Sequence, residues 1–259
     1  MKIHNERLLR CCILSLIAIT FSGCGTDPLA QPVAKQDAEN QMTAGDSSGA
    51  TATTAAAVAE NAKPAKPVAR MSDEAFRMAA EQGRIESVRK AIASGTDVNA
   101  ADPATTLTAL HLAAYSGHSD IAKLLLEHDA VVDVRDAKSL TPLHMAAYNG
   151  HSDAVTLFLE HDAKVDCRDD EGKTPLIHAC TGPFAQTVEI LLDAGAELNA
   201  TESTESFTPL MMAAGLGQTE VVELLLSRNA DKSMLDEDKD MAIDHARNEG
   251  HAAIVKLLE

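Results

Sequence analysis

A segment of about 33 residues recurs along the chain between residues 71 and 259. Its clearest copies carry a threonine at the same place, at positions 108, 141, 174 and 208, and Met241 continues the series. Two degenerate copies, at 75–83 and 241–251, flank these four. A repeat of this length is the signature of an array in which each unit buries its apolar face against the next. The sequence therefore predicts six stacked units rather than one conventional core.

Local signals within the copies favour two short helices per unit. Thr141 precedes Pro142, an order that suits a helix start because threonine can cap the helix and proline fits the first turn. Paired alanines at 113–114, 146–147 and 213–214 allow helices to approach closely. The second half of each unit has an apolar stripe, as in Val221 to Leu226, that only a neighbouring unit can cover. Aromatic residues make up only 3 % of the chain, which fits small, closely packed helices.

The turn that follows each second helix needs a residue in the left-handed conformation. Glycine stands there in two units, and an aspartate or asparagine in three others, the types that tolerate this conformation best after glycine. The residues expected to adopt it are Gly95, Gly195, Asp129, Asp162 and Asn229.

The run Thr141-Pro142-Leu143-His144-Met145-Ala146, with second halves such as Ile121 to Leu126, resembles the ankyrin repeat. The resemblance covers about 71–259 and implies an all-α ankyrin repeat solenoid, with helix-turn-helix units joined by hairpin fingers. It also implies a protein that binds other proteins and is not an enzyme. The expected units lie near 72–100, 107–134, 140–167, 173–200, 207–234 and 240–259.

Three departures from the repeat pattern stand out. Pro183-Phe184 replaces Gly-His in the fourth unit, where we expect a distorted link between the two helices. Ala109 replaces proline in the second unit, and the last unit lacks Thr-Pro, as a C-terminal cap would.

The N-terminus predicts export. Lys2, Arg7 and Arg10 precede an apolar stretch at 11–21, which is too short for a membrane span of roughly 20 residues. We interpret residues 1–23 as a signal peptide. The run Phe21-Ser22-Gly23-Cys24 resembles the bacterial lipoprotein signal, although Phe21 departs from the usual leucine. This resemblance implies lipidation of Cys24; ordinary secretion is the alternative.

Residues 24–70 are expected to be a lipid anchor followed by a disordered linker. The segment 26–70 has no aromatic residue and is rich in Ala, Thr, Gln, Pro and Ser, so it cannot bury enough apolar surface to fold. A head on such a tether would act in the cell envelope, on the periplasmic side or at the outer membrane.

The charge is concentrated in the repeats. Seven of the 22 basic and six of the 39 acidic residues lie in the first 70, which leaves 15 basic against 33 acidic residues in the repeat region. Such a surface repels phosphate backbones, so we expect no nucleic-acid partner. It could be a solvated surface only, or could attract a basic partner.

No residues have the spacing of a catalytic, metal or cofactor site. His111 and His144 occupy one repeat position and His178 is offset by one, so stacking separates them by roughly 8–10 Å, too far for one metal ion. The resemblance implies structural hydrogen bonds for them. Gly172-Lys173-Thr174 lacks the rest of a phosphate-binding loop. Cys180 is expected to be buried and inert, and Cys167 to be partly exposed.

The remaining candidate is a binding surface, which the ankyrin resemblance places on the fingers and on the exposed face of the first helices. Tyrosine is an effective interface anchor, and exposed apolar residues on fingers mark contact sites. Packing against the next helix is the alternative role for the tyrosines. The candidate residues are Leu107, Tyr115, Leu140, Tyr148 and Phe207, with a polar rim of Arg135, Lys138, Arg168, Asp170 and Glu171.

The sequence thus predicts a monomeric, membrane-tethered scaffold that binds another envelope protein. The alternatives are an enzyme or ligand-binding protein framed by the repeats, and a structural spacer of the envelope.

Overall fold

The computed structural model describes residues 70–259. The predicted signal peptide, Cys24 and the linker up to residue 69 lie outside the described residues. Within the described part, every regular element is an α-helix, as the repeat pattern predicts. The helices come in pairs along the chain: α2 (Asp73–Glu81) and α3 (Ile85–Ala93), α4 (Ala109–Tyr115) and α5 (Ser119–Leu126), α6 (Pro142–Tyr148) and α7 (Ser152–Glu160), α8 (Pro175–Ala179) and α9 (Ala185–Asp193), α10 (Pro209–Gly215) and α11 (Thr219–Ser227), α12 (Ala242–Asn248) and α13 (Ala252–Leu258).

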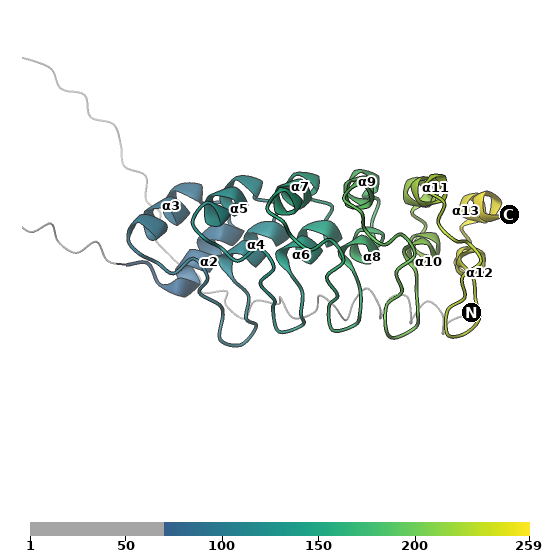
Figure 1. Ribbon diagram of the computed structural model, residues 1–259, viewed down its shortest axis with the longest axis horizontal. Helices are drawn as coiled ribbons and strands as arrows, with labels where there is room; N and C mark the ends of the chain where they lie inside the picture. The colour runs from purple at the N-terminus through teal and green to yellow at the C-terminus, as the bar shows by residue number, and fades with distance from the viewer. Residues whose placement is uncertain (1–69) are drawn as a thin grey trace, which may run out of the picture. The chain divides into compact units, whose positions relative to one another are not determined.

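The helices form two parallel rows (Figure 1). The first helix of each pair stacks on the first helix of the next, and the second helices stack in the same way. Hairpins project from the row of first helices, on the side away from the second helices. The stack therefore presents a row of hairpins beside a row of short helices.

Threonine begins the first helix in four of the pairs, as expected. The Thr174 and Thr208 hydroxyls accept the backbone N–H three residues later, a typical N-cap bond. At Thr108 and Thr141 the backbone N–H of the threonine also donates to Nδ1 of His111 and His144. Met241 takes this place in the last pair, where the Asp244 carboxylate accepts its N–H.

The turns after the second helices adopt the predicted left-handed conformation. Asp129, Asp162 and Asn229 have φ between 61° and 67°, and Gly95 and Gly195 have φ of 83° and 91°. The expectation is confirmed at all five positions.

Small residues let the first helices pack closely. The alanine pairs at 113–114, 146–147 and 213–214 are completely buried. In the second helices Val221, Val222 and Leu225 are buried, whereas the flanking Leu224 and Leu226 are only half-buried. A helix pair on its own would expose this apolar surface, and the neighbouring pairs cover it in the stack. The stability of each unit therefore depends on the units beside it.

The fourth pair is distorted as predicted. Helix α8 has five residues, against seven in α4, α6, α10 and α12. A histidine or glutamine precedes the second helix in four of the other five pairs and Arg84 in the first, but here Phe184 does. Its ring lies over Gly150 of the preceding unit, where any side chain would overlap it. Residue 150 must therefore be a glycine, because the Phe184 ring occupies the space where a Cβ would lie.

Candidate interaction surface

Five hairpins connect the helix pairs, and we number them as fingers 1 to 5. They comprise residues 102–107, 136–140, 169–173, 202–207 and 236–240. In each finger the first residue donates its N–H to the carbonyl of the last, at 2.9 to 3.2 Å. This bond closes the finger at its base.

An acidic side chain fixes the conformation of each finger. Asp136 Oδ1 accepts the N–H groups of Lys138 and Leu140 at 2.9 and 2.8 Å, and Asp102 acts in the same way in finger 1. The hydrogen bond from the Thr105 backbone, followed by that from Ala104, lowers the pKa of Asp102. In finger 4, which is one residue longer than fingers 2, 3 and 5, Glu202 replaces the aspartate and is 2 % exposed.

Backbone hydrogen bonds link the fingertips into one ladder. The bonds run from Ala137 N to Thr105 O, from Asp170 N to Lys138 O, from Ser203 N to Glu171 O and from Glu237 N to Glu205 O, at 2.8 to 3.1 Å. Successive fingers are also joined nearer the helices, where Asn99, Asp133, Asp166 and Asn199 each accept a backbone N–H about 31 residues further along. The fingers therefore form a continuous array with fixed spacing.

The two predicted rim arginines reinforce this array. Arg135 donates to the carbonyl of Arg168 at 3.1 Å, and Arg168 donates to the carbonyls of Thr201 and Gly172 at 2.6 and 2.9 Å. Each side chain thereby reaches the residue just before the next finger, 33 residues further along the chain. They stay on the surface, but their guanidinium groups are already oriented by the protein.

The other predicted rim residues gather on fingers 2 and 3. Ser139 donates its hydroxyl to the Asp170 carboxylate, next to the ladder bond between Asp170 and Lys138. Glu171 pairs with Lys173, whose side chain is 2 % exposed. The structure therefore brings Arg135, Lys138, Arg168, Asp170 and Glu171 together across one finger junction.

Two of the three predicted apolar contacts on the fingers are buried. Leu140 and Phe207 are 7 % and 4 % exposed, so they are not available as surface contacts. Each precedes the capping threonine and turns inward, and the Phe207 ring packs edge-on against His245 with the centroids 4.9 Å apart. Leu107, at the same position, is half-buried.

The tyrosines are half-buried. Tyr148 packs edge-on against His178 of the next first helix, with the ring centroids 6.0 Å apart. Packing against the next helix, the alternative considered for the tyrosines, is therefore part of the role of Tyr148. Tyr115 packs against the apolar core, and its carbonyl accepts a hydrogen bond from His151.

Two further exposed apolar side chains, Val131 and Leu235, precede fingers 2 and 5 in the chain and were not predicted as contacts. They are 53 % and 49 % exposed. Aligning the repeats could have found Val131, because Lys164, Glu197 and Asp231 occupy its position in the next units. Leu235 likewise stands where Arg135 and Arg168 stand in earlier units.

His111 and His144 have the structural role implied by the resemblance. Because Nδ1 accepts a backbone N–H, Nε2 carries the proton, and it donates to Leu140 O from His111 and to Cys167 O and Lys173 O from His144. Burial lowers the pKa of His111, and burial together with the neighbouring His178 lowers that of His144 to about 3. Both rings are therefore neutral near pH 7.

The two cysteines of the repeats are unreactive by environment. Both are free and buried, so the expectation that Cys167 is partly exposed is wrong: its side chain packs below the finger and is 6 % exposed. Desolvation raises the pKa of both thiols, which disfavours the nucleophilic thiolate.

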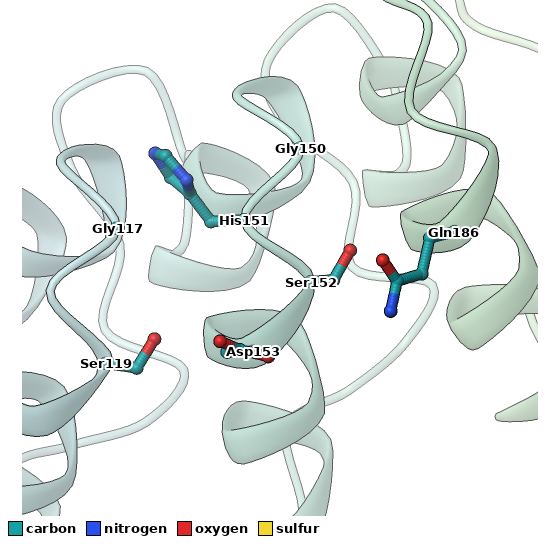
Figure 2. Close-up of a pocket in the computed structure, with 7 residues that line it drawn as sticks. All are labelled: Gly117, Ser119, Gly150, His151, Ser152, Asp153 and Gln186. Carbon is teal, nitrogen blue, oxygen red and sulfur yellow. The ribbon is translucent and has the colours of Figure 1, made fainter.

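A shallow polar depression of about 280 Å³ lies where α5, α7 and α9 begin (Figure 2). Ser119, Ser152, Asp153 and Gln186 line it, together with His151 and two glycines. The ring of His151 donates to Tyr115 O, and the Ser152 hydroxyl bonds to that of Thr187 at 2.9 Å. Neither is therefore arranged as a base with its nucleophile.

Among the described residues, no group of three or more His, Cys, Asp or Glu side chains is placed to hold a metal ion. Over the same part of the chain, no helix combines the length and apolar character needed to cross a bilayer.

The geometry defines a helical repeat protein with a pre-organised row of fingers. The family model described as ankyrin repeats (3 copies) matches residues 76–169, 130–202 and 162–236, which together cover more than half of the chain. The chain belongs to the ankyrin repeat family. Comparison with curated proteins found no significant match. Ankyrin repeats are generally protein-interaction modules, and this protein has the fold of one.

Proposed function

We propose that this protein is a non-catalytic scaffold that binds a partner protein through its fingers and the adjoining face of its first helices. The observation that carries the proposal is the hydrogen-bonded ladder of fingertips. A surface that is already ordered loses little conformational entropy on binding, which favours affinity.

The proposed contact surface is centred on fingers 2 and 3. It comprises the half-buried Tyr115 and Tyr148, Leu107, and the polar group of Arg135, Lys138, Arg168, Asp170 and Glu171. The exposed Val131, which precedes finger 2 in the chain, is proposed to add an apolar contact. Leu140 and Phe207 support the fingers from below.

A crosslinking pull-down from cells tests this surface. The Tyr115→Ala/Tyr148→Ala protein should lose specific partner recovery, whereas Lys123→Ala, an exposed change on the second-helix row, should keep it. Circular dichroism should show the same helix content for all three proteins. Unchanged recovery by a folded double variant would exclude the tyrosines from the site.

We further propose that the protein is an exported lipoprotein, anchored in the bacterial envelope through Cys24, and that its partner is an envelope protein. The support comes from the sequence: a charged start, an apolar stretch at 11–21 and small residues before Cys24. The head is proposed to act as a monomer.

Mass spectrometry of the mature N-terminus tests the anchor. We expect a lipid-modified Cys24 and loss of membrane association in Cys24→Ala. An unmodified N-terminus further along the chain would mean simple secretion.

A further inference from the structure

Two buried histidines from successive first helices hold finger 3. His144 of α6 donates Nε2–H to the carbonyls of Cys167 and Lys173, at 3.0 and 3.2 Å, on the two sides of the finger base. His178 of α8 bonds through Nε2 to Asp169 Oδ2 at 2.8 Å. The other oxygen of Asp169 accepts the N–H groups of Glu171 and Lys173 at 3.0 and 2.8 Å, which shape the finger.

No other finger has both histidines. Finger 2 is held by His111 alone, and finger 5 by His245 alone through Asp236. Finger 4 has neither, since Ile177 and Met212 occupy the two positions. Its Glu202 is instead satisfied by the N–H groups of Thr204, Glu205 and Phe207 and by the Thr204 hydroxyl.

One bond of His144 requires a neutral ring. Nδ1 accepts the N–H of Thr141 at 3.2 Å, so a proton on Nδ1 would break this bond and would have only the Thr141 hydroxyl oxygen, at 2.9 Å, as an acceptor. The ring is completely buried, and the His178 ring lies edge-on to it, with centroids 5.5 Å apart. The ionisable groups around the two rings are Asp169, the Glu171–Lys173 pair and Tyr148. Protonation in place is therefore strongly disfavoured.

We infer that finger 3 is a pH-sensitive part of the proposed binding surface, which opens more readily on mild acidification because the open form exposes His144 to protonation, while the opening of finger 4 does not respond. This inference rests on the proposed function, because finger 3 carries Asp170 and Glu171, is bonded to Lys138 of finger 2, and follows Arg168, to which Arg135 donates. Opening it would separate these contacts and weaken partner binding.

The size of the effect follows from the two states of the ring. An exposed histidine has a pKa of about 6.5, whereas burial next to His178 lowers the pKa of His144 to about 3. Each pH unit below about 6.5 therefore favours the open finger about tenfold, and the change from pH 7.5 to 5.5 about tenfold in total.

Hydrogen exchange of single amides by NMR on the repeat protein measures this opening without any partner. After correction for the intrinsic rates, the amides of Glu171 and Lys173 should show about a tenfold larger opening constant at pH 5.5 than at pH 7.5. The amides of Glu205 and Phe207 in finger 4 should change less than twofold. Equal responses of the two fingers would overturn the inference.

His144→Met is the matched variant, because the chain itself places Met211 at this position, where the sulfur accepts the Thr208 N–H at 3.5 Å. It should abolish the pH response of finger 3; an unchanged response would also refute the inference. Titration of the His144 ring by NMR in the wild type provides a second readout. The closed finger should leave this ring unprotonated above pH 5, so any protonation detected there should rise together with the opening measured by exchange.

Partner recovery at pH 7.5 and 5.5 connects opening to binding. A tenfold larger opening constant lowers the apparent affinity by at most about tenfold, so the wild type should bind more weakly at pH 5.5 than at pH 7.5 within this limit, and His144→Met should show no such change. The exchange experiment needs no partner. If the protein binds none, the tenfold change in opening should still be seen, but no partner would be recovered at either pH. If the open form becomes the major one at pH 5.5 and recovery still does not change, finger 3 is excluded from the binding surface.

Discussion

A single glycine marks how closely successive units approach. Gly150 has φ of 70° and lies beneath the Phe184 ring, whereas Gly195 has φ of 91° and no atom within 4 Å of where a Cβ would be. The two positions share the left-handed backbone and differ in the space available. Substitution at the two sites therefore distinguishes the energetic cost of a left-handed backbone, which both share, from the cost of steric overlap, which arises only at Gly150.

We predict that Gly150→Ala destabilises the protein by about 3 kcal/mol and Gly195→Ala by about 1 kcal/mol, because only the first adds overpacking to backbone strain. Urea unfolding of both variants measures the difference. Equal losses would mean that the Phe184 ring moves aside at no cost.

Elements were predicted more completely than their side-chain contacts. The 33-residue period and the threonine caps specify each helix pair locally, and the left-handed turns follow from Asp129, Asp162 and Asn229 because few residues tolerate that backbone. The inward turn of Leu140 and Phe207 could not be predicted, since it depends on how a finger folds back on its own unit. The cross-finger bonds of Arg135 and Arg168 also escaped prediction, because they join residues about 33 apart.

At the same scale, Arg168 should couple fingers 3 and 4. We predict that Arg168→Ala destabilises the protein by about 1 kcal/mol and speeds amide exchange at Ser203, whose N–H bonds to Glu171 O. Arg168→Lys should restore only part of the protection, because the lysine ammonium ends short of the position of Nη1, which donates to both carbonyls. Full protection in the alanine variant would show that the backbone ladder alone holds the fingers.

At the scale of the whole repeat stack, two buried and neutral histidines join successive units. His111 and His144 each span two units, and burial lowers the pKa of both below the ordinary value near 6.5. The unfolded chain therefore binds more protons than the folded one below about pH 6.5, so stability must fall as the pH falls through this range.

For His144 the loss extends from about pH 6.5 down to about pH 3 and amounts to about 2 kcal/mol at pH 5. Denaturant unfolding between pH 7.5 and 5 should show this decline, and His144→Met should reduce it. A midpoint that does not change over this range would contradict the protonation argument.

The ladder of fingertips has a consequence for how such a chain can diversify. Fingers 1 and 4 have one residue more than fingers 2, 3 and 5, yet the same backbone bonds run through all of them without interruption. In every finger the last residue but one is left-handed: Thr106, Ser139, Gly172, Ser206 and Lys239. The extra residue of fingers 1 and 4 therefore lies before the left-handed residue, so a finger can be longer while the bonds to its neighbours keep their places. The array thus tolerates a longer loop at each tip, and single fingers can be exchanged one at a time.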